Sequence, residues 1–80
     1  MRLSELKTNQ KAKIIQVHHV TKSAEQDTIA TRLDSLGFVN GEIVEIITKG
    51  LFGSEPLLVK IGFSRFALRR AEADRIEIEI

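Results

Sequence analysis

Short runs in which apolar and polar residues alternate occur along much of the chain, and they predict β-strands. In the clearest run Ile76, Ile78 and Ile80 alternate with charged residues. Such alternation places apolar side chains on one face of a strand and charged ones on the other. Adjacent Ile14 and Ile15 break the pattern, which indicates a β-bulge or burial on both faces. The predicted strands cover residues 12–20, 42–48, 57–61, 65–69 and 75–80.

A different spacing predicts one helix, at residues 23–36, between the first two strands. Ile29, Leu33 and Leu36 follow the i, i+4, i+7 spacing that gathers side chains on one helical face. These three residues and Phe38 are therefore expected in the hydrophobic core. Replacing a core leucine such as Leu33 by alanine should cost roughly 2–5 kcal/mol of stability.

The ends of this helix carry recognisable signals. Ser23 is the expected N-cap, with Gln26 as the returning residue of a capping box, and Asp27 is an alternative cap. Gly37 follows the last apolar position and suits the left-handed conformation that ends many helices.

Small and turn-forming residues mark the connections. Residues 49–56, which contain two glycines and the only proline, are expected to form a loop. Residues 62–64 predict a tight turn, and residues 1–10 and 70–74 each predict a single helical turn. Five short twisted strands and one helix would curl into a small barrel, with the helix over an open end. The expected fold class is therefore mostly β, with one domain spanning residues 1–80.

Composition narrows the function classes. The chain has 80 residues, no cysteine, tryptophan or tyrosine, and a net charge of +1 from 12 basic and 11 acidic side chains. The lack of cysteine excludes disulfides, thiolate metal sites and cysteine nucleophiles. So small a core leaves little room for an enzyme's pocket, and near-neutral charge is unusual for a nucleic-acid binder. No signal peptide and no apolar run of about 18 residues is present, so a cytoplasmic protein without membrane insertion is expected.

Two pairs of residues were considered as chemical sites. His18 and His19 are adjacent, so on a strand they point to opposite faces and cannot easily share one metal ion. Glu77 and Glu79 lie on one strand face, but no neighbouring residue completes an acid–base or cation site. We expect structural or surface roles for all four, with neither a catalytic residue nor a metal site.

Two other groups suggest protein contacts. Leu51 and Phe52 lie at the expected tip of the 49–56 loop, where neighbouring apolar residues often mark a partner site. Folding over the open barrel end is the alternative for this pair. Arg65 and Arg69 share the predicted strand face, with Arg70 beyond it, and form either a basic patch or ordinary paired surface charge.

Several short segments, spread in a characteristic order over nearly the whole chain, together match a known family pattern. They comprise Leu3, Leu6, Ala12, Arg32-Leu33, Leu36-Gly37-Phe38, Gly41, residues 43–47, Gly53, Pro56-Leu57, Ala67-Leu68-Arg69, Ala73 and Ile76. With this set the chain resembles the ferrous iron transport protein A (FeoA) family. That family often has glycine where this chain has Asn9 or Gln10, and asparagine tolerates the left-handed backbone that such a turn requires.

The resemblance implies an SH3-like barrel and a role as a cytoplasmic accessory of ferrous iron uptake. The implied partner is the cytoplasmic face of the membrane GTPase permease, ferrous iron transport protein B. The barrel rim, the Leu51–Phe52 segment, the helix carrying Arg32, and Arg65 and Arg69 are the expected contacts. No enzymatic activity and no cofactor is expected.

Two other functions stay open at this point. A nucleic-acid-binding or transcription-regulator-type domain would use Arg65, Arg69 and Arg70. A metal chaperone or hydrolase would use His18, His19 and nearby acids. The sequence leaves open whether a partner is activated or restrained, whether Fe(II) or nucleotide modulates the contact, and whether the barrel associates with itself.

Overall fold

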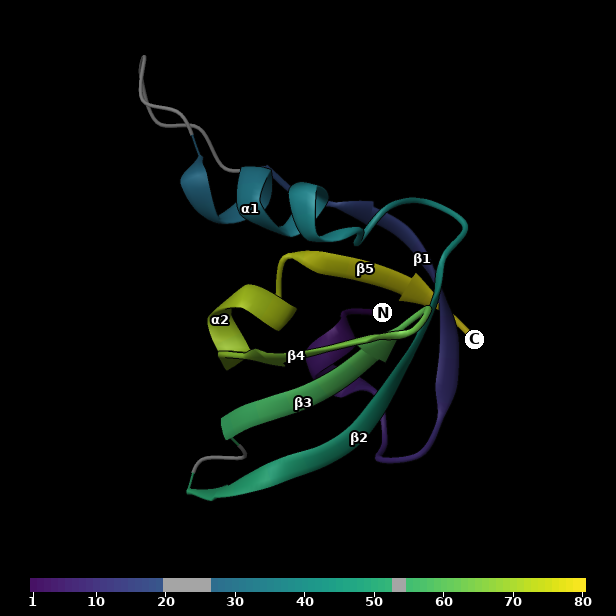
Figure 1. The fold of residues 1–80 in the computed structure, drawn as a ribbon, viewed down its shortest axis with the longest axis vertical. Helices are drawn as coiled ribbons and strands as arrows, with labels where there is room; N and C mark the ends of the chain where they lie inside the picture. The colour runs from purple at the N-terminus through teal and green to yellow at the C-terminus, as the bar shows by residue number, and fades with distance from the viewer. Residues whose placement is uncertain (20–26, 53–54) are drawn as a thin grey trace.

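The computed structural model describes residues 1–19, 27–52 and 55–80, with the backbone alone for residues 51 and 52 (Figure 1). The elements are η1 (Leu3–Glu5), β1 (Lys11–Val17), α1 (Thr28–Leu36), β2 (Ile43–Phe52), β3 (Glu55–Ile61), β4 (Ser64–Leu68), α2 (Arg70–Ala73) and β5 (Ile76–Glu79). No helix within these ranges is long and apolar enough to cross a membrane.

All five strands belong to one antiparallel sheet in the order β4–β3–β2–β1–β5. Figure 1 shows the sheet curled round, with α1 lying beside β1 and β5 and with α2 joining the two edge strands. The prediction of a mostly β chain with five strands and a helix between the first two is confirmed. The single turns predicted at the N-terminus and at residues 70–74 are η1 and α2.

A β-bulge in β1 explains the adjacent isoleucines. Ile14 pairs with Ile78, but the next pair joins Gln16 to Glu77, so Ile15 is an extra residue on β1. Ile14 is buried and Ile15 only half-buried. The bulge was one of the two predicted explanations, and the structure confirms it.

The predicted loop at residues 49–56 is wrong. β2 continues to Phe52, which pairs with Glu55, and β3 already begins at Glu55. The signal that misled is Gly50: a Cβ placed there would lie 1.6 Å from the backbone oxygen of Glu55. This glycine permits a close approach of two strands and does not form a turn.

Helix α1 begins at Thr28, and its N-cap is Asp27, whose side chain accepts a hydrogen bond from the Ala30 N–H at 3.2 Å. The alternative cap is thereby confirmed, while the predicted start at Ser23 lies outside the described residues. Gly37 ends the helix with φ 105°, as expected.

One residue of the predicted apolar stripe lies on the flank of α1. Ile29 is 36% exposed, whereas Ala30 and Leu33 are buried. Successive helical residues are about 100° apart, so a buried face centred between Ala30 and Leu33 leaves Ile29 and Leu36 at its margins. The assignment of Ile29 to the core is therefore wrong, and the small Ala30 takes its place against the sheet.

The core is formed by apolar side chains from every strand, both α-helices and the N-terminal segment. Its fully buried larger members are Phe38, Leu3, Leu6, Ile14, Leu33, Ile46, Leu57, Leu68, Ile76, Val44 and Val59. The N-terminal segment is held in part by Asn9, which has φ 66° and donates its N–H to the Ile46 carbonyl at 2.7 Å. The left-handed turn expected at this asparagine is confirmed.

An ion pair ties the start of α1 to the sheet. The guanidinium of Arg75, just before β5, donates to the Asp27 carboxylate and to the His18 carbonyl, the latter at 3.4 Å. The carboxylate is almost fully buried, and its partners compensate the cost of desolvating the charge.

Candidate protein-interaction site

The Leu51–Phe52 pair does not form a loop tip. Both residues belong to β2, and the backbone of Phe52 pairs with that of Glu55. Their side chains lie outside the described part of the structure, so a partner contact through them stays a prediction.

Arg32 links the two α-helices. Its guanidinium, about half exposed on α1, donates to Oε2 of Glu72 in α2. The other oxygen of that carboxylate accepts the Arg69 N–H at 2.8 Å. Arg32 thus has a structural role, and its predicted partner contact is untested.

The arginines predicted on one strand face are separated. β4 ends at Leu68, and Arg69 is the N-cap of α2, so Arg65 alone is on the strand. Arg70 donates its backbone N–H to Glu55 Oε1 at 2.6 Å. Arg65 lies opposite Lys60 of β3, and two like charges in that position repel each other. Partner or nucleic-acid binding by these arginines stays a prediction.

The two histidines point to different carboxylates. His18 Nε2 lies 2.6 Å from Glu77 Oε1 of β5, and His19 Nε2 lies 3.0 Å from Asp34 Oδ2 of α1. This agrees with the expectation that the two adjacent histidines point in different directions. Each pair ties the end of β1 to a neighbouring element.

Glu77 is held as a carboxylate by its neighbours. The hydrogen bonds from His18 and from Gln16 lower the pKa of Glu77 from its ordinary 4.5. Glu79 is exposed on the same strand face. The pair lies on the outer face of an edge strand, as expected, and the ion pair of Glu77 with His18 was not predicted.

An exposed apolar surface that was not predicted from the sequence lies at the start of β2 and at the turn between β3 and β4. Among the described residues six large apolar side chains are exposed, and four of them gather there: Val39, Ile43, Phe63 and Ile80. Val39 precedes β2. Ile43 in β2 pairs with Lys13 in β1, and Lys13 pairs on its other side with Glu79, the residue before Ile80. We call these four residues the apolar end. Phe63 is the extreme case, with a relative exposure of 106%.

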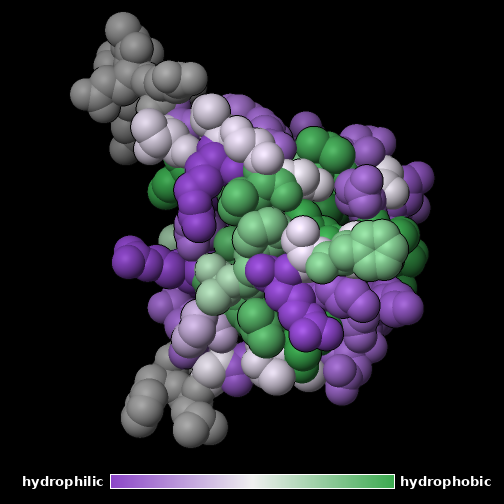
Figure 2. Space-filling model, in the orientation of Figure 1, coloured by the Kyte–Doolittle hydropathy of each residue, from purple (hydrophilic) through white to green (hydrophobic). Residues whose placement is uncertain are grey.

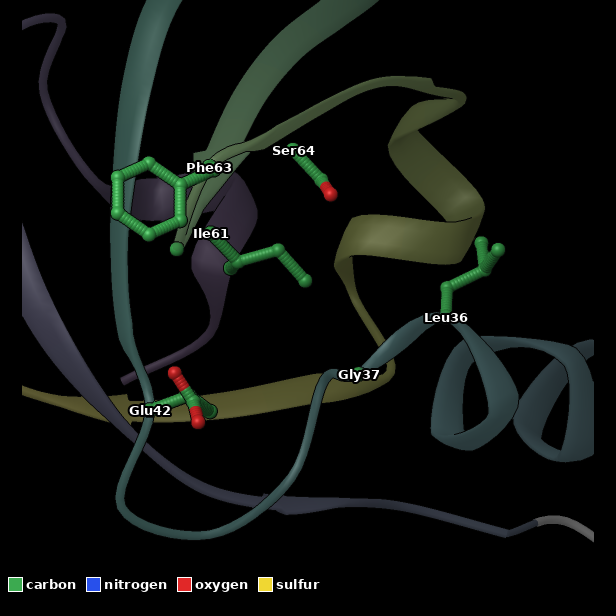
Figure 3. Close-up of a pocket in the computed structure, with 7 residues that line it drawn as sticks. Leu36, Gly37, Glu42, Ile61, Phe63 and Ser64 are labelled. Carbon is green, nitrogen blue, oxygen red and sulfur yellow. The ribbon is translucent and has the colours of Figure 1, made fainter.

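A pocket of about 280 Å³ lies beside this end, between the last turn of α1 and the β3–β4 turn. Its lining residues are Leu36, Gly37, Glu42, Ile61, Gly62, Phe63 and Ser64. Figure 2 shows apolar residues in the middle of one face and, interspersed with polar ones, towards its right side, while the left side and the lower margin are mostly polar. Figure 3 shows the Ile61 side chain at the centre of the pocket and the Glu42 carboxylate and Ser64 hydroxyl directed into it.

The signal for this site was present in the sequence. Gly62 has φ 55° in a two-residue turn between β3 and β4, and this turn projects the next side chain outward. A phenylalanine at such a position is unusual, because turns are normally polar. Reading Phe63 only as part of a turn missed it.

Comparison with known proteins identifies the family. The FeoA domain model matches residues 1–80 of the chain. The chain belongs to the FeoA domain family. No curated protein matches it.

Solved FeoA structures share this fold. A zinc-complexed FeoA from Stenotrophomonas maltophilia is 47% identical, with 99% of this chain and 89% of that one covered and a TM-score of 0.86. That protein is described as a prokaryotic SH3 domain protein and suggested as a ferrous iron transport activating factor. The iron(II) transport protein A of Clostridium thermocellum is 34% identical over all of this chain and 45% of that one, with a TM-score of 0.82.

Likeness extends at the level of fold to a manganese-dependent transcriptional repressor. It is 13% identical, with 95% of this chain and 39% of the repressor covered and a TM-score of 0.74. Identity this low supports a common fold alone.

The zinc held by the Stenotrophomonas FeoA prompts a test of the donor groups here. No group of three or more histidine, aspartate or glutamate side chains that could hold a metal ion occurs in the described ranges. His18 and His19 are engaged with carboxylates on different elements. The described residues therefore do not fit a zinc site.

Proposed function

We propose that this protein is a small cytoplasmic accessory protein of ferrous iron uptake. It binds the cytoplasmic part of the membrane permease, ferrous iron transport protein B, and does so without catalysing a reaction or holding a cofactor. The observation that carries this proposal is the match of the whole chain to the FeoA domain. The role suggested for the 47% identical Stenotrophomonas FeoA, activation of ferrous iron transport, supports it.

The contact surface that fits this role best is the apolar end with its pocket. A fully exposed phenylalanine contributes nothing to the packing of the free protein, but aromatic side chains are among the strongest anchors in protein interfaces. The pocket beside Phe63 offers a concave apolar surface for a partner side chain. A protruding anchor next to a hollow is typical of a protein-binding site.

The mechanism follows from linkage. An accessory protein without chemistry of its own acts by binding one conformation of the permease more tightly than another. A preference of about 1.4 kcal/mol changes the ratio of the two conformations about tenfold. The direction of the effect, activation or restraint, depends on which conformation exposes the complementary surface.

The test is a binding titration with the purified cytoplasmic domain of the permease. The protein, labelled with a fluorophore because it has no tryptophan, should show saturable binding that Phe63→Ser weakens. Ile29→Ser, which removes an exposed apolar side chain from α1, is the matched control and should bind like wild type. Absence of binding by the wild-type protein at hundreds of micromolar would contradict the proposal.

A further inference from the structure

The pocket beside Phe63 combines an apolar floor with an exposed carboxylate that has no ion-pair partner among the described residues. Leu36 is half-buried and Ile61 almost fully buried, and both present aliphatic surface to it. The Glu42 carboxylate enters from one margin and the Ser64 hydroxyl from another (Figure 3). Both side chains are exposed, and neither has a hydrogen-bond or ion-pair partner among the described residues. The pocket therefore offers two free acceptor groups above an apolar surface.

No described cation of the chain itself satisfies this carboxylate. The nearest basic residues along β3 and β4 are Lys60 and Arg65, which lie opposite each other on the two neighbouring strands. Ile61 and Ser64 line the pocket, so their chain neighbours Lys60 and Arg65 lie on the opposite face of the sheet. The Glu42 carboxylate, which is exposed to solvent, is therefore accessible to a group of a partner.

The charge of the pocket selects among occupants. An anionic lipid headgroup or a nucleic-acid phosphate would bring a negative charge against Glu42 and would be repelled. A purely aliphatic side chain would make no contact with the carboxylate and the hydroxyl at the margin of the pocket. A side chain that has an apolar stem and a cationic end group with several hydrogen-bond donors matches the apolar floor, the carboxylate and the hydroxyl.

We propose that the pocket receives an arginine side chain from the partner protein. The aliphatic stem packs on Leu36 and Ile61, and the planar guanidinium donates to Glu42 and Ser64. The same plane can stack on the exposed ring of Phe63, which stands on the Glu42 side of the pocket in Figure 3. Arginine suits this site better than lysine because its head is flat and offers several donors in fixed directions.

This inference rests on the proposed function only for the identity of the partner, so its site is tested first without the permease. The isotope-labelled protein is titrated with the capped tripeptide Ala-Arg-Ala and followed by amide chemical shifts. Saturable shifts are expected at Glu42, Phe63 and Ser64. The same peptide with citrulline, which keeps the shape but lacks the charge, should bind about fivefold to tenfold more weakly. Equal binding of the arginine and citrulline peptides would overturn the proposal.

Two charge variants provide the matched comparison. Glu42→Gln should weaken the arginine peptide about fivefold to tenfold, whereas Glu45→Gln should bind like wild type. Glu45 is on the same strand but faces Lys60 and Lys11 on the outside of the sheet. Amide spectra of both variants establish that they are folded. Identical binding by the two variants, or equal affinity for a lysine peptide, would contradict the arginine assignment.

The permease domain then separates the two proposals. If it binds wild type and Glu42→Gln equally, the arginine pocket is wrong while the proposed function stands. If it binds neither although the arginine peptide fills the pocket, the proposed function is wrong while the pocket assignment stands. If the domain binds wild type and binds Glu42→Gln more weakly, both the arginine pocket and the proposed function are supported.

Discussion

Among the described residues, Phe63 is the one whose replacement by alanine separates folding from binding most cleanly. The ring has a relative exposure of 106%, so its removal withdraws no buried surface from the free protein. The free energy of unfolding should therefore change by less than about 0.5 kcal/mol. If the ring is buried in the permease interface, the loss is roughly 1.5–3 kcal/mol of binding free energy. That corresponds to an affinity about 10-fold to 150-fold weaker.

Two measurements on the same sample check this expectation. Urea denaturation gives the stability of Phe63→Ala, and fluorescence anisotropy gives its affinity for the permease domain. Phe38→Ala is the matched control, because that ring is fully buried and its loss should cost about 3–5 kcal/mol of stability. A Phe63→Ala variant that loses more than about 1 kcal/mol of stability, or binds like wild type, would refute the reasoning.

Three further predictions concern the fold. Leu33→Ala should lower the free energy of unfolding by roughly 2–5 kcal/mol in urea denaturation, because the side chain is fully buried; a loss below about 1 kcal/mol would show that α1 is not packed as described. Gly50→Ala should destabilise by more than about 1 kcal/mol, since its Cβ would meet the Glu55 backbone, and a melting temperature equal to wild type would contradict this contact. The lowered pKa of Glu77 means that its contribution to stability is present above pH 4.5 and is lost as the pH falls below that value; His18→Ala, followed by denaturation between about pH 3 and pH 5, should flatten this loss, and an unchanged slope would contradict the assigned hydrogen bond.

Local patterns predicted much of the fold. Alternation and runs of β-branched residues located all five strands. For the adjacent Ile14 and Ile15, a bulge was one of the two explanations predicted, and it is the one observed. Asp27 and Gly37 gave the described ends of α1, because their side-chain and backbone preferences act within a few residues.

Features that depend on contacts between distant segments were not predictable in the same way. Gly50 reads like a turn residue until the backbone of Glu55 is placed against it. Ile29 fits the helical stripe, yet the sheet packs against the neighbouring Ala30. Both errors arise because a periodic pattern fixes which residues share a face but not which part of that face meets the rest of the protein.

The candidate site shows the same limit. The pocket requires α1, the start of β2 and the β3–β4 turn to converge, and no single segment of sequence contains that information. The predicted contacts through Leu51 and Phe52 and through Arg65 and Arg69 depend on an expected loop tip and on an expected shared strand face, and the structure has neither. The predicted contact through Arg32 is untested. Phe63 is unusual in the sequence because it is an aromatic residue in a two-residue turn. This became informative only when the structure showed that its side chain is fully exposed.

Mapping the permease contact by amide chemical shifts tests the central claim most directly. The labelled protein, titrated with the cytoplasmic domain of ferrous iron transport protein B, should show its largest changes at Leu36, Glu42, Phe63 and Ser64. Changes centred on α2 and the outer face of β4, with the pocket residues unaffected, would contradict the account.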